Sequence, residues 1–357
     1  MRTYRNFYPQ IYAFANLYAA YVAARRAKRG RIEVVRFADR VEEQLFRLQI
    51  ALQTQTYQPG AYRNFYIHEP KRRKISAAPF RDRVVHHALV KVIEPIYEPK
   101  FIYDSYACRV GKGTHRALDR CTEWVGQYRY VLQCDIAKFF PTIDHAILLK
   151  ILGRTIADPQ VYWLCEQIIK SGAGILDAER EIFWFPGDDL FEPLRPQGLP
   201  IGNLTSQFWA NVYLNELDQF AKRVLKCHAY VRYADDFLLF SDDKATLHLW
   251  HDELRAFAAE RLRLHLHDHK CQVYPTRTGV PFLGFRHYGT HRRLKREAVV
   301  RFRRRMREMQ GLYTEGRISR EKIGERIQSW CAHAAHGNTY RVRNQVLRQA
   351  IFRTGAR

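Results

Sequence analysis

The chain has 357 residues, 46% of them hydrophobic and 13% aromatic, which predicts a globular protein rather than a disordered one. Its formal net charge of +23 favours a polyanionic partner, which leaves RNA, DNA or an anionic membrane surface. Seven scattered cysteines without a Cys-x-x-Cys pair predict reduced thiols in a cytoplasmic protein, and the lack of a long apolar run or signal-peptide pattern disfavours the membrane.

The first part of the chain is predicted to be mainly helical. Residues 9–29 place apolar side chains three and four positions apart and end in a basic run, as in an amphipathic helix, and residues 37–53 give a second helix. Residues 57–75 have a strand-turn-strand pattern, and helical periodicity returns at 80–97.

The middle of the chain alternates apolar runs with a polar break. Residues 131–170 are predicted to form a strand, a helix and a second strand, and 180–185 a further strand. The polar segment 187–198 is typical of a loop, and its Asp188-Asp189 pair is interpreted as a solvated turn. A helix opens at 202–207, after this loop.

Two adjacent carboxylates, Asp235 and Asp236, lie between two strand-like runs within 230–240. An ordinary hairpin would turn at Asn-Gly or Asp-Gly, and neighbouring carboxylates are costly unless a cation compensates them. Mg²⁺ binds carboxylate oxygens and completes its shell with water and substrate phosphates. The motif therefore predicts a metal site for phosphoryl transfer, and the alternative is a solvated turn between two strands.

Asp135 ends a strand-like run 100 positions before Asp235 and could supply a third carboxylate. If its strand pairs with the 230–240 hairpin in one sheet, the three carboxylates meet. Nucleotidyl transfer by two metal ions requires such bridging acids, because ions ~3.5–4 Å apart serve the attacking 3′-hydroxyl and the leaving pyrophosphate. On its own, Asp135 would more simply be a turn residue.

The last part of the chain combines a short hairpin with a basic helical region. Residues 281–289 resemble a hairpin, and residues 291–357 hold 18 Lys and Arg against 5 Asp and Glu. Three alternating histidines, His265, His267 and His269, would share one face of a strand. With no cysteine or acid at suitable spacing, a polar face near nucleic acid is favoured over a metal cluster.

Between about residues 57 and 290, seven ordered blocks resemble the fingers and palm of reverse transcriptases. The blocks are Lys71–Arg73 with Asp82-Arg83, Ser105–Gly113, Asp135–Phe140, Gln197–Gln207, Tyr233–Asp236, Leu264–Lys270 and Phe282–Gly284. The resemblance implies an α+β right-hand polymerase with fingers, a palm whose antiparallel sheet carries the YADD hairpin, and a helical thumb. It divides the chain into an N-terminal helical extension at 1–56, fingers and palm at 57–290, and a basic thumb at 291–357.

By this resemblance, Asp135, Asp235 and Asp236 are the catalytic residues and bind two Mg²⁺ ions. The main-chain carbonyl of Ile136 is a further ligand. Template RNA, primer or cDNA, and dNTPs are the implied partners and substrates. No block of spaced acids typical of RNase H follows the palm, so we expect removal of the template RNA to depend on other proteins.

The resemblance also assigns residues around the incoming nucleotide. Lys71 and Arg73 would clamp the triphosphate, with the register inside 71–74 left open and a solvated basic hairpin as the alternative. Phe140 would be the aromatic gate against the ribose 2′-hydroxyl, or else a core residue. Lys270 would approach the phosphates.

Two further sets of residues would contact the nucleic acid strands. Phe282, Leu283 and Gly284 would meet the primer terminus, with surface or core packing as the alternative. A thumb helix would lay guanidinium groups along template–primer phosphates, and its binding to the nucleic acid would weaken with added salt. The alternative is a solvated charged helix. The residues expected on this helix are Arg301, Arg303, Arg304 and Arg305.

The fourth block departs from most reverse transcriptases. Ile201-Gly202-Asn-Leu-Thr-Ser-Gln replaces the usual Gln-Gly-x-x-x-Ser-Pro, so Ile201 stands where a glutamine would contact the incoming nucleotide, next to Gly202. We hypothesise that loss of this polar contact contributes to low fidelity, because specificity comes from groups that a wrong pair leaves unsatisfied.

This variant, together with the Trp330…His333…His336 region, resembles the enzymes of diversity-generating retroelements of bacteria and phages. Such enzymes copy a template-repeat RNA into cDNA with errors at adenines, and they work with a small basic accessory protein. The alternatives are another bacterial reverse transcriptase, group II intron-like or defence-associated, and a catalytically idle RNA-binding scaffold.

Overall fold

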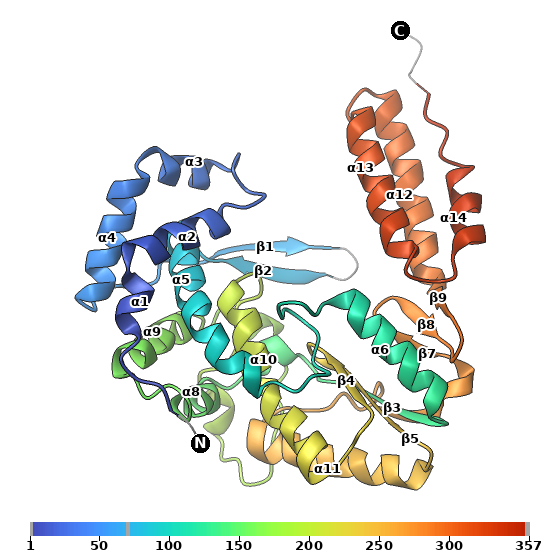
Figure 1. The fold of residues 1–357 in the computed structure, drawn as a ribbon, viewed down its shortest axis with the longest axis horizontal. Helices are drawn as coiled ribbons and strands as arrows, with labels where there is room; N and C mark the ends of the chain where they lie inside the picture. Colours follow the sequence, from blue (N-terminus) through green and yellow to red (C-terminus); the bar gives the residue numbers. More distant parts are fainter. Residues whose placement is uncertain (1–2, 69–71, 354–357) are drawn as a thin grey trace.

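The computed structural model describes residues 3–68 and 72–353 (Figure 1). The N-terminal part has four helices, of which the first three pack on one long helix, α5, and the fourth packs on those three. Helix α5 occupies the predicted range Phe80–Tyr97. The four are α1 (Tyr8–Tyr12), α2 (Phe14–Ala24), α3 (Ile32–Asp39) and α4 (Val41–Gln53). The single helix predicted at 9–29 is two helices, because Ala13 leaves the helical region with ψ of 130°. The helix predicted at 37–53 is likewise interrupted at Arg40.

A two-stranded hairpin extends from this helical part, as the strand-turn-strand pattern predicted. Strands β1 (Arg63–Ile67) and β2 (Arg73–Ala77) pair antiparallel. Lys71, one of the predicted triphosphate ligands, lies outside the described residues. In Figure 1 the hairpin points toward the C-terminal helices.

The central sheet carries the YADD hairpin and has the strand order β4-β5-β3-β6, with every pair antiparallel. Its strands are β3 (Tyr130–Asp135), β4 (Tyr230–Tyr233), β5 (Asp236–Ser241) and β6 (Gln272–Pro275). Successive side chains point to opposite faces. On β3, Val131 packs with helix α6 (Thr114–Gln127), whereas Leu132 joins the core around α5, α10 (Leu204–Gln219) and α11 (Lys244–Leu262).

Two predicted strands in the middle of the chain are wrong. The segment after β3 contains α7 (Phe139–Thr142), α8 (His145–Gly153) and α9 (Pro159–Lys170) in place of a helix and a second strand. Asp158 caps α9 by accepting from the backbone N–H groups of Gln160 and Val161, and buried apolar residues recur at helical spacing from there. Residues 180–185 are irregular and pair with no strand among the described residues.

The C-terminal part begins with a small sheet and ends in three helices. The predicted hairpin at 281–289 is confirmed as β7 (Val280–Phe282) and β8 (Phe285–His287), and β9 (Arg292–Leu294) adds a third strand. Helices α12 (Arg296–Thr314), α13 (Arg320–Ala334) and α14 (Tyr340–Leu347) follow. They share a small core in which Phe302 stacks on Trp330 with ring centroids 4.1 Å apart.

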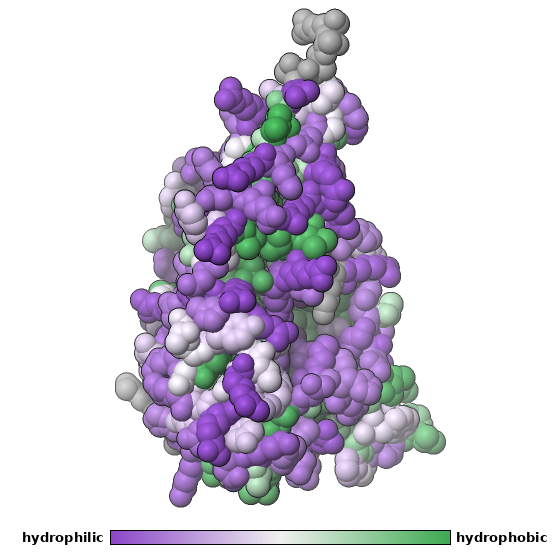
Figure 2. Space-filling view, turned by 90° about the vertical axis from the view of Figure 1, so that its right-hand side faces the viewer, coloured by the Kyte–Doolittle hydropathy of each residue, from purple (hydrophilic) through white to green (hydrophobic). Residues whose placement is uncertain are grey.

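Figure 2 shows the side of the molecule on which the C-terminal helices lie. Hydrophilic residues cover most of this side and surround a central hydrophobic patch. Within the described parts of the chain, no helix has the length and apolar character that a membrane span requires.

Candidate active site

The central sheet brings the three predicted acids together. In the β3–β5 ladder Asp135 lies opposite Asp236, and in the β4–β5 hairpin Tyr233 pairs with Asp236. Ala234 and Asp235 therefore form the two-residue turn between the strands. The strand pairing on which the carboxylate site depends is confirmed, and the catalytic roles of the three acids remain predictions.

The turn that carries Asp235 has a strained backbone. Ala234 has φ of 56°, a left-handed conformation that residues with a Cβ rarely adopt. A glycine is the usual residue at a position of this kind in a tight hairpin turn, and the strain costs on the order of 1 kcal/mol or more. Other contacts must therefore hold the acid pair in this geometry.

The acids lie where their charges are poorly solvated. Burial, together with the nearby charges of Asp135 and Asp235, raises the pKa of Asp236 to about 7. Burial also raises the pKa of Asp235, as does Asp135, while Arg73 and Lys270 oppose the rise. One carboxylate oxygen of Asp236, Oδ1, is buried without a hydrogen-bond partner among the described residues. Such a group of acids is chemically suited to a divalent cation.

A lysine neutralises part of this charge in the structure. The Lys270 ammonium forms an ion pair with the Asp135 carboxylate, which is 23% exposed. In the described parts of the chain, no three His, Cys, Asp or Glu side chains are arranged to hold a metal ion. The set of carboxylates fits Mg²⁺ in its chemistry, but Asp135 is paired with Lys270 and does not complete a shell of protein ligands.

The backbone just after Asp135 is fixed by the segment that precedes β6. His267 donates its backbone N–H to the Asp135 carbonyl at 2.8 Å, and Ala137 donates to the His265 carbonyl at 2.9 Å. These two bonds flank the antiparallel bridge between Ile136 and Leu266. In such a bridge the residue between the bonds directs its own carbonyl away from the partner strand, so the Ile136 carbonyl faces the β5 side, where Asp236 lies.

The predicted nucleotide residues Phe140 and Ile201 lie on two segments that run side by side. Leu199 donates its N–H to the Phe140 carbonyl at 2.9 Å, and Gly198 donates to Ile143 at 2.8 Å. Phe140 is half-buried, with its ring edge-on to that of Phe139 at 5.3 Å between centroids. The half-buried ring is compatible with either of its predicted roles.

Ile201 and Gly202 connect this segment to the fingers hairpin. Ser76 at the end of β2 donates its N–H to the Ile201 carbonyl at 2.9 Å. Gly202 has φ of +116°, and a Cβ there would lie 2.9 Å from Cγ2 of Ile75. Arg73, on the same strand, is close enough to the acids to act on Asp235. The 201–202 turn and β2 therefore lie against one another beside the carboxylates.

Asn203 is a residue that the sequence analysis did not single out. Its buried amide donates to the carbonyls of Ser76 at 2.9 Å and Pro200 at 3.0 Å, and its oxygen accepts from the Ala78 N–H at 3.1 Å. It thus locks the 200–203 turn to the end of β2. An asparagine directly before a helix was the available sequence signal, but it would have been interpreted as a helix cap.

The residues predicted to contact the primer form the turn between β7 and β8. Leu283 and Gly284 have φ of 46° and 87°, while the Phe282 ring is fully buried in the core beside α6. Only the Leu283–Gly284 part of this turn is therefore placed to reach a bound strand. The Gly284 carbonyl accepts the N–H of Lys295 at 3.0 Å, which links the turn to the start of α12.

The predicted thumb arginines lie on α12, whose buried side is formed by Phe302, Met306 and Met309. Arg304 and Arg305 are exposed, and Arg301 and Arg303 are half-buried. The basic residues thus cover the outside of a helix that packs through its apolar side.

Two predictions on side-chain clusters need correction. His265, His267 and His269 lie in a loop with one bridge rather than on a strand, and His265 contacts Asp268 at 3.1 Å. The turn at Asp188-Asp189 is present and Asp189 is exposed as predicted, but the Asp188 carboxylate is buried in an ion pair with Arg263.

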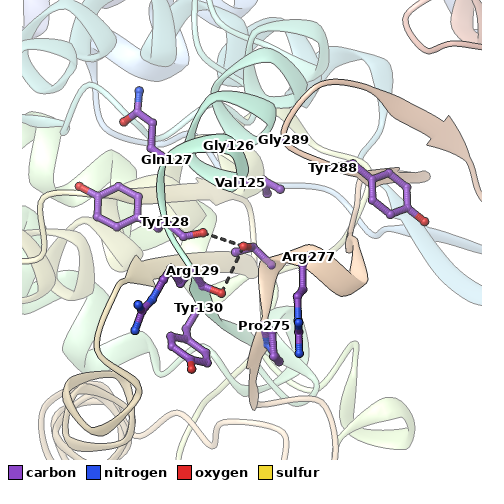
Figure 3. Close-up of a pocket in the computed structure, with 11 residues that line it drawn as sticks. Val125, Gly126, Gln127, Tyr128, Arg129, Tyr130, Pro275, Arg277, Tyr288 and Gly289 are labelled. Carbon is purple, nitrogen blue, oxygen red and sulfur yellow. Dashed lines mark hydrogen bonds between the residues drawn. The ribbon is translucent and has the colours of Figure 1, made fainter.

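A separate hollow of 680 Å³ lies at the far end of β3 from Asp135 (Figure 3). It is bounded by the C-terminal end of α6, a short 3-10 turn (Thr276–Thr278) and Tyr288. Figure 3 shows Arg129 and Arg277 pointing away from α6 on either side of Pro275. Because Tyr130, at the opposite end of β3 from Asp135, lines it, this hollow is distinct from the carboxylate site.

Residues 67–287 match the family model described as reverse transcriptase (RNA-dependent DNA polymerase). The chain is 29% identical over 274 residues to Protein YkfC of Escherichia coli K12, which covers 64% of this chain and 67% of that protein. It is also 29% identical over 182 residues to the group II intron-encoded protein LtrA of Lactococcus lactis subsp. cremoris. That match covers 50% of this chain but only 28% of LtrA.

Among solved structures, the chain resembles telomerase from Candida albicans in complex with a TWJ fragment of telomeric RNA. The TM-score is 0.39 with 12% sequence identity, over 74% of this chain and 52% of the telomerase chain.

Proposed function

The chain belongs to the reverse transcriptase (RNA-dependent DNA polymerase) family, and we propose that it is an active polymerase that extends a primer with dNTPs on an RNA template. The observation that carries this proposal is the convergence of three carboxylates, with Asp135 opposite Asp236 and Asp235 in the adjoining turn. The fold is α+β and that of a right-hand polymerase. We assign the N-terminal extension to 1–56, the fingers and palm to 57–290 and the thumb to 291–357.

In this proposal the three acids and the Ile136 carbonyl would hold two Mg²⁺ ions. Such ions activate the primer 3′-hydroxyl and stabilise the leaving pyrophosphate. Among the described residues, the Asp236 Oδ1 atom, buried without a hydrogen-bond partner there, is the feature that best fits a cation.

Positively charged side chains around the acids would receive the triphosphate. Arg73 on β2 and Lys270 beside Asp135 both act on the charge of Asp235. Lys270, which is paired with Asp135 here, would contact a phosphate once the acids are neutralised. Lys71, which lies outside the described residues, remains a proposed triphosphate ligand, and Phe140 would exclude ribonucleotides at the sugar.

The thumb would bind the template–primer duplex through its arginines. Phosphate contacts of this kind position the duplex without reading its sequence. If the four residues each neutralise one phosphate, the plot of log affinity against log salt should become less steep by about 0.9 for each arginine removed. The four arginines are Arg301, Arg303, Arg304 and Arg305. The β7–β8 turn would lie at the primer end of the duplex.

Primer extension tests the proposal directly. The purified chain should extend a DNA primer on an RNA template with Mg²⁺ and dNTPs, and Asp235→Ala should abolish extension. Asp252→Asn is a matched control, because Asp252 is 78% exposed on α11, and it should leave extension unchanged. A parent chain that binds RNA but extends no primer would support an idle scaffold instead, and persistent extension by Asp235→Ala would disprove the assigned site.

As the finer proposal, we assign the chain to retroelement-driven sequence diversification, with adenine-directed errors in cDNA copied from a template-repeat RNA and a small basic accessory protein as partner. The support is the fourth block, in which Ile201 presents an aliphatic side chain beside β2 at the position of the usual glutamine. Ile201→Gln should lower misincorporation opposite template adenine, with the other template bases as internal controls. An unchanged error rate opposite adenine would refute the role of Ile201.

The second candidate is a group II intron-like reverse transcriptase. It is favoured by the 29% identity to the intron-encoded LtrA over half of this chain. The two candidates differ in error pattern, since the diversifying enzyme should misincorporate mainly opposite adenine. Equal error rates opposite all four template bases would therefore favour the intron-like enzyme.

A further inference from the structure

Beneath the YADD turn lies a fully buried ion pair that the proposed chemistry does not use. Arg232 on β4 and Asp218 on α10 are both 0% exposed, and their closest contact is 2.6 Å. Tyr230 and Arg232 face α10, whereas the alternate residues Val231 and Tyr233 pack on the α6 side with β5. The pair thus lies behind the sheet, on the face opposite α6.

The guanidinium of Arg232 has five N–H donors, and the structure gives a partner to each of them. The partners are Asp218 Oδ1 at 2.7 Å and Oδ2 at 2.6 Å, Ser105 Oγ at 2.9 Å, Asn211 Oδ1 at 3.2 Å and the Ala234 carbonyl at 3.1 Å. The last acceptor belongs to Ala234, the residue of the turn that has the left-handed backbone. The guanidinium therefore ties the strained turn to α10 and to the segment around Ser105.

The backbone of Arg232 reinforces the same connection. Its N–H donates to the Asp104 carbonyl at 2.9 Å, and its carbonyl accepts the N–H of Tyr106 at 3.0 Å. Asn211 holds this segment a second time by donating to the Ala107 carbonyl at 2.8 Å. Strand β4, which leads into the acid pair, is thus held by the 104–107 segment along the edge away from β5 and by Asp218 on its α10 face.

Stability alone does not account for a charge pair in this position. Burial opposes the charge on Arg232, but the facing Asp218 carboxylate, with smaller contributions from Tyr230 and Asp235, raises the pKa of Arg232 above the usual value. Buried ion pairs replaced by apolar residues of similar volume often leave a protein equally or more stable, because desolvation offsets their attraction. A planar fork with five directed donors does what an apolar side chain cannot, which is to fix the orientation of a particular carbonyl.

We propose that Arg232 and Asp218 are positioning residues that hold the Ala234–Asp235 turn, and with it the acid pair, in register with Asp135. The inference rests on the proposed polymerase function. It predicts that loss of the guanidinium fork disturbs the acids while leaving the nucleotide site in place. Residues that orient metal ligands from behind typically affect metal affinity or activity by 10- to 100-fold.

The test uses Arg232→Lys, which keeps the positive charge but offers three donors without a planar fork. We expect kcat for primer extension to fall by roughly 10- to 100-fold, with KM for dNTP within about threefold. In the protein without nucleotides, Mn²⁺ titration followed by electron paramagnetic resonance should show about tenfold weaker binding. Arg154→Lys is the matched control, because Arg154 forms a 2.7 Å ion pair with Glu216 of the same helix α10, and it should change neither quantity.

A second substitution distinguishes positioning from a general loss of structure. Glycine adopts positive φ without strain, so Ala234→Gly added to Arg232→Lys should recover several-fold of the lost kcat. If Arg232→Lys does not fold, Ser105→Ala decides the question, since it removes one donor's partner and should lower kcat several-fold at constant KM.

The proposal is overturned if folded Arg232→Lys retains kcat and Mn²⁺ affinity within threefold of the parent, or if Ala234→Gly restores nothing. Failure of the polymerase proposal has a different signature. The parent chain would then extend no primer, while Mn²⁺ binding would still report whether Arg232 positions the acids.

Discussion

Replacement of Asp236 by asparagine should stabilise the metal-free protein at alkaline pH. The folded protein holds the pKa of Asp236 at about 7, against an ordinary value of 3.8, because the carboxylate is buried beside two other acids. The raised pKa means that the folded state binds this proton more tightly than the unfolded state does. The protonated Asp236 carboxyl therefore makes its full contribution to the free energy of unfolding below pH 3.8, and this contribution is lost as pH rises to about 7.

The size of the effect follows from the same two pKa values. One pKa unit corresponds to 1.36 kcal/mol, so ionisation of Asp236 should cost the folded state on the order of 4 kcal/mol above pH 7. At pH 5 somewhat more than 1 kcal/mol of this has already been lost. Between pH 5 and pH 8 the advantage of Asp236→Asn over the parent should therefore grow by about 2–3 kcal/mol.

Urea unfolding in EDTA at pH 5 and pH 8 measures this difference. Asp252→Asn is the control for an exposed acid and should differ from the parent by the same amount at both pH values. Saturating Mn²⁺ at pH 8 should stabilise the parent more than Asp236→Asn, because the cation compensates the charge that the substitution removes. If the advantage of Asp236→Asn is equal at pH 5 and pH 8, burial and the neighbouring acids do not raise the pKa of Asp236 as the structure indicates.

Three further substitutions test the surroundings of the acids. Phe140→Ala should raise incorporation of ribonucleotides relative to dNTPs by tenfold or more if the ring is a gate, whereas a core residue would lower thermal stability without changing that ratio. Gly202→Ala should destabilise the protein by roughly 1–3 kcal/mol in urea unfolding, since its φ of +116° and a β2 side chain 2.9 Å away both oppose a Cβ. Gly324→Ala is its control, because Gly324 lies in α13 with no atom near the added Cβ and should be neutral or stabilising. Lys270→Met should lower thermal stability in EDTA but not in saturating Mn²⁺, because the cation replaces Lys270 as the counter-charge of Asp135; an equal loss in both conditions would contradict this role.

The sequence was sufficient for the features that depend on local pattern. Alternating apolar residues on either side of Asp235 predicted the β4–β5 hairpin, and the acid at the end of the run at 131–135 predicted the neighbouring strand. The prediction failed in the last part of 131–170, where a second strand was expected. The N-cap at Asp158 and the helical spacing of the buried residues after it identify this part as the helix α9.

The contacts that shape the site could not be predicted in this way, because they join residues far apart in the chain. Lys270 and Asp135 are 135 positions apart, and nothing near either residue indicates the pairing. Asn203 resembled a helix cap, although its amide binds the end of β2. Asp188 resembled a solvated turn residue because its partner, Arg263, lies 75 positions later in the chain, at the C-terminal end of α11.

The same reasoning explains why the polar residue behind the sheet went unnoticed. An arginine at the third position of an apolar strand, Arg232, suggests an exposed edge until α10 is known to cover it with Asp218. The left-handed backbone at Ala234 and the mutual repulsion of the acids both favour a different turn. A rigid, fully satisfied guanidinium resists that change because any movement of the turn would leave a buried donor unpaired, at a cost of about 1–3 kcal/mol. The unfavourable geometry of the acids and the buried ion pair are therefore two parts of one arrangement, in which the core holds in place a turn that would otherwise relax.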